Sequence, residues 1–193
     1  MDTEYLFTAA DERLLAAGGG HGRRVRIFEY PGSGSRPGPL GKTAFLAAGR
    51  AALQDLLAAD PRPIFLLGES IGSGTACALA ADSPAHLAGL ALVVPFARLQ
   101  EVAQEKFRWL PVGLLLRDKF DNIAALARSR CPVVIVVAGE DEVVGAAQGR
   151  KVYERCPAPK LLITLAGVGH NSIDMEPPAP WFRQTAEFLL RRH

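Results

Sequence analysis

The sequence has few cysteines, and none of them stands in the spacing of a metal site or a disulfide framework. Cys77, Cys131 and Cys156 are an odd number and contain no C-x-x-C pair. We therefore expect no metal site and no set of disulfides, and a reducing compartment is the default. Cys77 stands in an alanine-rich stretch, where a small buried thiol is the ordinary interpretation.

Long apolar runs are also absent. No uninterrupted apolar stretch approaches the roughly 20 residues that span a membrane, and the start Met1-Asp2-Thr3-Glu4 lacks the basic and apolar regions of a secretory leader. The net charge is only +2, and the basic clusters are not interleaved with aromatic residues, which disfavours nucleic-acid binding. We expect a soluble cytoplasmic protein with no membrane span and no nucleic-acid partner.

The 193 residues, 49% of them hydrophobic, are enough for one core but not for two full domains. No internal repeat or linker is visible, so we expect one domain over residues 1–193. Strands are expected near residues 25–30, 63–67, 87–94, 132–138 and 161–165, and helices near residues 4–17, 43–59, 75–81, 148–155 and 181–192. Apolar strands alternating with helices predict the α/β class, with a parallel sheet of about five or more strands covered on both faces.

One segment, residues 96–122, differs in kind because Phe107, Trp109, Leu110 and Leu114 stand among charged residues. It can be interpreted as a mobile or pocket-lining insertion, or as two ordinary helices that cover the edge of the sheet. The sequence leaves both interpretations open.

The most informative stretch is Gly68-Glu69-Ser70-Ile71-Gly72, between an apolar run and an alanine-rich helix. It fits the G-x-S-x-G nucleophile elbow in the strand-turn-helix context that this motif requires. Glycines are needed because side chains next to the strained serine turn would collide with the neighbouring strand and helix. The alternative is a tight turn with a serine that caps the helix.

Two more candidate groups follow later strands. Asp141 follows the strand at 132–138, and His170 follows the strand at 161–165, so both are expected at the carboxyl edge of the sheet together with Ser70. A serine hydroxyl needs an imidazole to take its proton, and a carboxylate to orient that imidazole. Glu140 or Glu142 could replace Asp141 as the acid. The N–H of Ile71, at the helix start, would donate to the developing oxyanion.

Two other motifs are weaker. The loop before residue 43 invites a phosphate-binding interpretation, but Arg36 stands where a glycine is needed, and Pro37 and Pro39 remove main-chain donors. Gly20-His21-Gly22 precedes a strand instead of following one, so we interpret it as a turn and not as an oxyanion loop.

Taken together, these motifs resemble the α/β-hydrolase superfamily, in particular its serine aminopeptidase-like branch, which includes protein depalmitoylases and monoacylglycerol-lipase-like enzymes. The matching stretches are residues 29–34, 68–74, 95–96, 109–112, 118–121, 141–144, 149–153 and 169–171. The resemblance implies hydrolysis of esters or thioesters, and less readily of amides, with Ser70 as nucleophile, Asp141 as acid and His170 as base.

The beginning of the chain departs from the family pattern. Family members have a strand that ends in a His-Gly-Asn-like loop, which supplies the second oxyanion donor, whereas here the chain is expected to begin at the following helix. We therefore hypothesise a shortened hydrolase that lacks this inner strand and has an impaired oxyanion hole. An exposed strand edge left by the loss would favour self-association.

The sequence thus predicts a serine hydrolase that acts on acyl esters or thioesters through an acyl-enzyme and uses no cofactor. Its partner would be a small-molecule or lipidated acyl substrate, with Trp109, Leu110 and Leu114 as candidate substrate contacts. The alternative is a non-catalytic protein of hydrolase fold that serves as a binding module.

Overall fold

The structure is a computed structural model that describes residues 4–8, 24–33, 36–59, 63–82, 86–107, 109, 116, 118–176 and 179–191. The strands are β1 (Glu4–Thr8), β2 (Arg24–Ile27), β3 (Ile64–Glu69), β4 (Leu87–Val93), β5 (Val133–Ala138) and β6 (Lys160–Leu165). The helices are α1 (Lys42–Ala59), α2 (Ile71–Ala81), α3 (Leu99–Lys106), α5 (Asn122–Leu126), α6 (Ala146–Arg155) and α7 (Pro180–Leu190).

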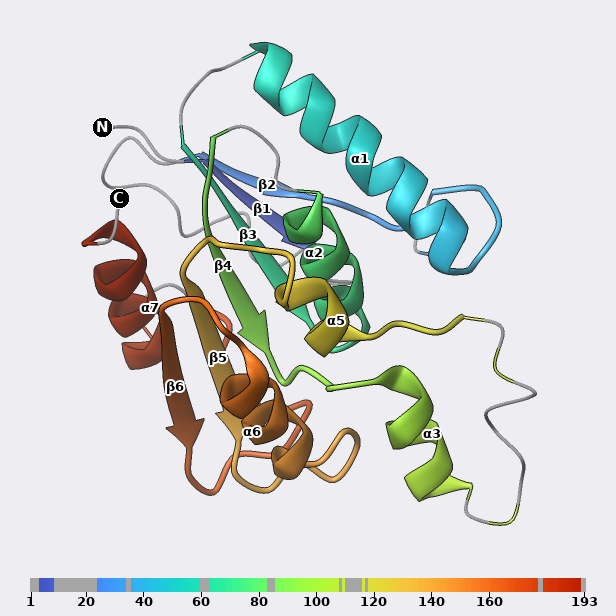
Figure 1. Cartoon of the computed structure of the whole chain (residues 1–193), viewed down its shortest axis with the longest axis vertical. Coiled ribbons are helices and arrows are strands. Elements are labelled where there is room, and N and C mark those ends of the chain that lie inside the picture. The colour runs from blue at the N-terminus through green and yellow to red at the C-terminus, as the bar shows by residue number, and fades with distance from the viewer. Residues whose placement is uncertain are drawn as a thin grey trace.

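The six described strands form one parallel sheet in the order β2-β1-β3-β4-β5-β6. β4 and β5 are buried along almost their whole length because helices cover both faces, as Figure 1 shows. The predicted α/β class with a covered parallel sheet is therefore confirmed.

One prediction for the beginning of the chain is wrong. Residues Glu4–Thr8 are a strand and not the start of a helix, and this strand lies inside the sheet between β2 and β3. It pairs with both neighbours, with Phe7 opposite Ile27 on one side and Leu67 on the other. The inner strand that we expected to be missing is therefore present. The rest of the expected helix and the Gly20-His21-Gly22 turn fall outside the described residues.

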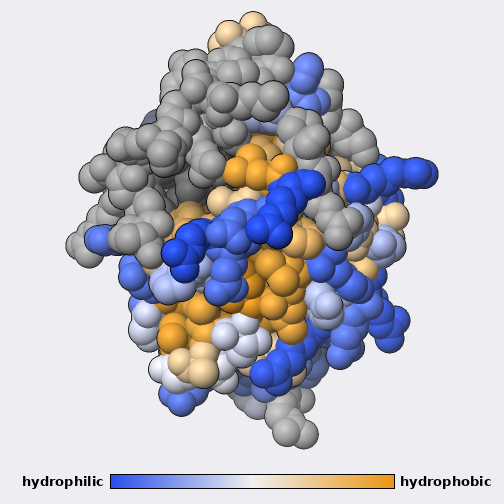
Figure 2. Space-filling view, turned by 90° about the vertical axis from the view of Figure 1, so that its left-hand side faces the viewer, coloured by the Kyte–Doolittle hydropathy of each residue, from blue (hydrophilic) through white to orange (hydrophobic). Residues whose placement is uncertain are grey.

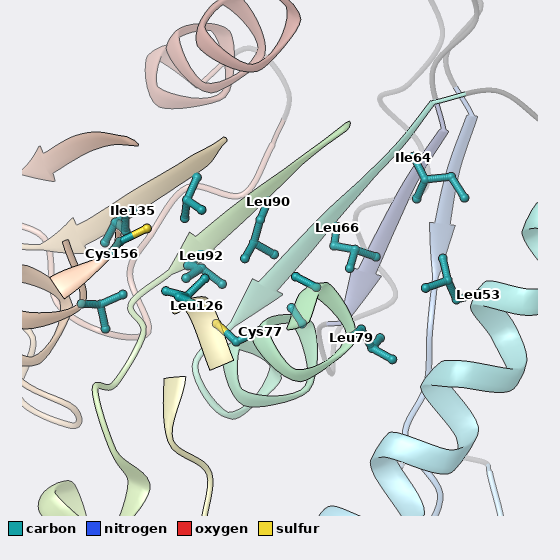
Figure 3. Packing of buried hydrophobic residues seen from close by; sticks show 14 of the residues in the cluster. Leu53, Ile64, Leu66, Cys77, Leu79, Leu90, Leu92, Leu126, Ile135 and Cys156 are labelled. Carbon is teal, nitrogen blue, oxygen red and sulfur yellow. The ribbon is translucent and has the colours of Figure 1, made fainter. Parts of the chain in front are cut away.

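The two larger hydrophobic clusters of the core lie one on each face of the sheet. Alternate residues of a strand point to opposite faces, and in β3 Leu66 belongs to one cluster whereas Phe65 belongs to the other. The first cluster joins the sheet to α1, α2 and α5 through Leu53, Leu79 and Leu126 (Figure 3). It also joins the sheet to α6 through Val152. The second joins it to α7 through Trp181 and Leu189.

Cys77 lies in the first cluster as a fully buried free thiol. Burial, together with the neighbouring Cys156 and Cys131, raises the pKa of this thiol well above its ordinary value. The interpretation of Cys77 as a small apolar core residue is confirmed.

The side of the molecule where β6 and α7 lie carries an apolar area bordered by hydrophilic residues (Figure 2). β6 is the last strand of the sheet, and its Leu161 and Leu165, which pack against the second cluster, are only partly buried. The second cluster therefore reaches the surface at this edge of the sheet.

Candidate active site

Ser70 lies in a strained turn between β3 and α2. Its backbone has φ 47° and ψ −118°, a conformation that is uncommon for a residue with a side chain. A Cβ added to Gly68 would lie 2.7 Å from both the Cβ of Ala76 and the carbonyl oxygen of Gly72. The glycine is required because the strand and the helix approach closely there, as the nucleophile-elbow interpretation predicts.

The imidazole of His170 bridges the hydroxyl of Ser70 and the carboxylate of Asp141. His170 Nε2 lies 3.0 Å from Ser70 Oγ, and Nδ1 lies 3.0 Å from each carboxylate oxygen. The His170 and Asp141 side chains are only 6% and 2% exposed. Because a carboxylate accepts hydrogen bonds, Nδ1 carries the proton and leaves Nε2 to accept the hydroxyl hydrogen of Ser70.

The Asp141 carboxylate is anchored by the backbone that follows it. Its Oδ1 accepts hydrogen bonds from the N–H groups of Val143 at 2.9 Å and Val144 at 2.8 Å. Burial opposes ionisation of this carboxyl, but the hydrogen bonds from His170 and from the main chain outweigh burial and hold its pKa below the ordinary value.

Of the three acidic residues that the sequence left as candidates, Glu140 and Glu142 have no recorded hydrogen bond to the imidazole of His170. The carboxylate of Glu142 accepts the main-chain N–H of His170 at 3.3 Å, and Glu140 is exposed. Asp141 is therefore the carboxylate that meets the imidazole of His170. Asp118 and Asp121 accept the N–H groups of Lys42 and Ala124 near helix starts.

Ile71 is the first residue of α2, so its main-chain N–H has no acceptor within the helix. The residues directly after β1, where the family pattern places the second donor, fall outside the described residues. An impaired oxyanion hole therefore stays a prediction, although its original ground, the missing strand, no longer holds.

Of the predicted substrate contacts, Trp109 is 80% exposed, and Leu110 and Leu114 fall outside the described residues. The role of these three residues as substrate contacts therefore stays a prediction.

Sequence reasoning missed a small apolar cluster that consists of Phe96, Phe120 and Val144, with Leu46, Leu99 and Val102 packed against it. The ring of Phe120 lies 2.7 Å from the place that a Cβ on Gly74 would take, so the cluster touches the first turns of α2. Leu99 and Val102 come from α3, which contributes no fully buried residue. A lid function of residues 96–122 stays a prediction.

Two features are absent from the described residues. These residues contain no group of three or more His, Cys, Asp or Glu side chains placed to hold a metal ion. No helix among them is long and apolar enough to cross a membrane.

The sequence is similar to several curated proteins, although no protein-family model matches it. An uncharacterized protein of Mycobacterium tuberculosis is 34% identical over 165 residues, which cover 84% of this chain and 58% of that protein. Human alpha/beta hydrolase domain-containing protein 17C is 30% identical over 163 residues, which cover 81% of this chain and 48% of that protein. The chain thus spans about half the length of the curated relatives it matches.

Solved structures share the fold at lower sequence identity. The Paleococcus ferrophilus monoacylglycerol lipase superposes with a TM-score of 0.69 at 19% identity, over 100% of this chain and 95% of that one. The Pyrococcus furiosus esterase gives 0.71 at 16% identity, over 99% and 82%. Together with the parallel sheet and the serine turn, this likeness shows that the chain has the α/β-hydrolase fold.

Proposed function

We propose that this protein is a serine hydrolase that cleaves carboxylic esters or thioesters through an acyl-enzyme, with Ser70 as nucleophile, His170 as base and Asp141 as acid. The observation that carries the proposal is the position of His170, hydrogen-bonded on one side to the Ser70 hydroxyl and on the other to a buried carboxylate. A neutral imidazole placed in this way can remove a proton from the hydroxyl during attack.

In the first half-reaction Ser70 Oγ forms a bond to the acyl carbon, and the hydroxyl proton moves to His170 Nε2. The N–H of Ile71 donates to the oxygen of the tetrahedral intermediate. Collapse breaks the bond between carbon and the leaving oxygen or sulfur, and His170 returns its proton to that atom. Asp141 stays ionised and stabilises the imidazolium while the proton resides there.

In the second half-reaction water attacks the acyl-enzyme, with His170 again accepting the proton. The second tetrahedral intermediate collapses, Ser70 Oγ leaves with the proton from His170, and the carboxylic acid is released. The chemistry requires no cofactor, because each proton that leaves an oxygen returns through the same imidazole.

An acyl substrate is supported by the named neighbours, a monoacylglycerol lipase and an esterase, and by the apolar cluster at the first turns of α2. We also propose that Trp109, Leu110 and Leu114 contact the acyl chain. Trp109 is a large apolar side chain left 80% exposed, which makes it available to an apolar ligand.

Hydrolysis of p-nitrophenyl esters and acyl thioesters of increasing chain length tests the proposal. We expect turnover by the wild type, a loss in kcat of about 10⁴-fold or more in Ser70→Ala, and retained turnover in His86→Asn, which alters an exposed histidine. Full turnover by Ser70→Ala would refute the mechanism. A folded wild type that hydrolyses no member of the series would favour the non-catalytic alternative.

Chain length tests the proposed substrate contacts separately. We expect kcat/KM to rise with acyl chain length in the wild type and to rise less in Trp109→Ala. The loss of an apolar contact should weaken the binding of long acyl chains more than the binding of an acetyl group. If kcat/KM rises equally with chain length in the two proteins, Trp109 does not contact the acyl chain.

A further inference from the structure

A buried asparagine outside the triad is connected to the serine turn. Asn122, the first residue of α5, is 1% exposed. Its side-chain Nδ2 donates to Ser73 Oγ at 3.0 Å and to the carbonyl oxygen of Phe96 at 2.9 Å. The Phe96 carbonyl can only accept, so the amide nitrogen must face it, and the orientation of the Asn122 amide is thereby fixed.

The hydroxyl of Ser73 continues this connection. Ser73 is fully buried, and its Oγ donates to the carbonyl oxygen of Ser70 at 2.6 Å. Because Nδ2 of Asn122 is a donor, Ser73 Oγ accepts from it and directs its single hydrogen to Ser70. The main-chain N–H of Ser73 donates to the same oxygen at 3.0 Å. Two donors therefore hold the Ser70 carbonyl in one direction.

A fixed Ser70 carbonyl fixes the N–H of Ile71. The two groups belong to the same planar peptide unit, in which a trans bond makes them point in opposite directions, and the described residues contain no cis peptide. A rotation of this plane would turn the Ile71 N–H away from the oxygen of the carbonyl group that Ser70 attacks. It would also stretch both hydrogen bonds to the Ser70 oxygen.

Asn122 is itself held firmly. Its main-chain N–H donates to the carbonyl oxygen of Ala97 at 2.9 Å, and the N–H of Ala97 donates to Oε1 of the buried Gln148 at 3.1 Å. The segment that anchors Asn122 is thus fixed from α5 on one side and α6 on the other. Such anchoring lets a side chain hold another group within a fraction of an ångström.

We propose that Asn122 is a positioning residue that acts through Ser73 to aim the Ile71 N–H at the oxyanion of the tetrahedral intermediate. This inference rests on the proposed hydrolase function. It adds to the triad a support for the oxyanion donor that consists of the side chains of Asn122 and Ser73. Among the described residues, neither side chain has a recorded hydrogen bond to Asp141 or His170.

The test compares Asn122→Ala, Ser73→Ala, the double variant and Thr75→Val as a matched control. Thr75 lies on the same helix, is fully buried, and its hydroxyl has no hydrogen-bond partner among the described residues. We expect Asn122→Ala and Ser73→Ala each to lower kcat about 10- to 100-fold, less than the 10²- to 10³-fold typical of a lost oxyanion donor, with KM unchanged. Thr75→Val should keep the wild-type kcat.

Two readouts separate positioning from a purely structural role. If Asn122 acts through Ser73, the double variant should be no slower than Ser73→Ala alone. Affinity for a trifluoromethyl ketone, whose adduct with Ser70 places an oxyanion in the same position, should fall by the same factor as kcat/KM. If Asn122 has a purely structural role, the variants should have a lower melting temperature, but their loss of inhibitor affinity should not match their loss of kcat/KM.

Wild-type kcat in a folded Asn122→Ala or Ser73→Ala would overturn the inference, as would losses that multiply in the double variant. If Asn122→Ala does not fold, Ser73→Ala decides alone, because it removes only one oxygen. An active wild type with unimpaired variants refutes the inference and leaves the proposed function intact. A wild type without turnover refutes both.

Discussion

At the scale of single residues, the state of His170 depends on the carboxylate behind it. Asp141 presents two oxygens to Nδ1 at 3.0 Å, and one of them is fixed by the N–H groups of Val143 and Val144. Such a carboxylate selects the tautomer in which Nε2 is unprotonated. The unprotonated Nε2 can thus accept the hydrogen of the Ser70 hydroxyl, which lies 3.0 Å away.

Replacing Asp141 by asparagine should therefore impair the reaction without disturbing the backbone. In Asp141→Asn the amide oxygen would keep the N–H groups of Val143 and Val144, and the amide nitrogen would donate to His170 Nδ1. Nε2 would then carry the proton and could not accept one from Ser70. We expect kcat to fall about 10⁴-fold with little change in KM. Steady-state kinetics on an activated ester measure the effect, and a loss below tenfold would contradict the assigned tautomer.

The lowered pKa of Asp141 also predicts how stability depends on pH. A carboxyl whose pKa is lower in the folded protein than in the unfolded chain adds stability above the unfolded value, near the ordinary 3.8. This contribution disappears as the pH falls through the folded value. The stability gap between wild type and Asp141→Asn should thus be widest above about pH 4 and narrow in stronger acid.

Urea unfolding at a series of pH values measures that gap. Ser70→Ala is the control, because it changes no group that titrates in this range. A gap between wild type and Asp141→Asn that stays constant from neutral pH to below pH 3 would show that the folded protein does not favour the ionised carboxyl of Asp141.

At the scale of elements, the site depends on how closely β3 and α2 approach each other at the serine turn. In Gly68→Ala the new Cβ would meet the backbone of Gly72 and Ser73 at 2.7 and 2.8 Å. These atoms belong to the same turn as Ser70, so they cannot move away without shifting Ser70. The free energy of unfolding should fall by about 1–3 kcal/mol or more, and activity should fall with it.

Gly49→Ala is the matched comparison for this glycine. Gly49 lies inside α1, and a Cβ there would meet the end of the Leu79 side chain at 3.2 Å. The gain in helix propensity of about 1 kcal/mol should roughly offset this contact. Chemical denaturation of both variants tests the contrast, and a Gly68→Ala protein as stable as Gly49→Ala would contradict the close packing described for the turn.

The elements that sequence reasoning predicted are those whose pattern is local. The helix at residues 43–59 has an apolar stripe and is α1 in the structure. The serine turn is preceded by an apolar run and followed by a good helix former, so its geometry could also be predicted. β1 was missed because Leu6, Phe7 and Ala10 share a helix-like spacing with the leucines that follow. Its strand partners begin at Arg24 and Ile64, far along the chain, where local spacing gives no signal.

The connection from Asn122 to Ser73 could not be read from the sequence for a related reason. The two residues stand 49 positions apart, and neither has a spacing that marks it as functional. By contrast, Ser70, Asp141 and His170 each follow a predicted strand, so a parallel sheet alone places them at one edge. The order of strands and residues along the chain does not give the distances between these three side chains or their chemical roles. The roles remain the proposal.

At the scale of the whole molecule, the two hydrophobic clusters are separated only by the sheet. Leu66 and Phe65 are adjacent in β3, are 0% and 2% exposed, and belong to opposite clusters. Because the same strands carry both clusters, neither should be able to unfold while the other remains folded. The described residues are then expected to behave as one cooperative unit, in agreement with the predicted single domain.

This expectation is tested with Leu66→Ala and Phe65→Ala. We expect losses of about 2–5 kcal/mol for the leucine and about 3–5 kcal/mol for the phenylalanine, each with a single transition. Far-UV circular dichroism and tryptophan fluorescence should report the same midpoint in each variant. Two separate transitions, or a variant that loses only one cluster, would show that the sheet does not couple its faces.

The central claim is that the fold assembles an activated serine, and labelling with a fluorophosphonate tests it most directly. The probe forms a bond from phosphorus to Ser70 Oγ and releases fluoride only if the hydroxyl proton is removed. Intact-mass measurement should show one added phosphonyl group on the wild type and none on Ser70→Ala or heat-denatured protein. His170→Ala should be labelled far more slowly, and His86→Asn at the wild-type rate. A folded wild type that remains unlabelled, or equal labelling of Ser70→Ala, would contradict the claim.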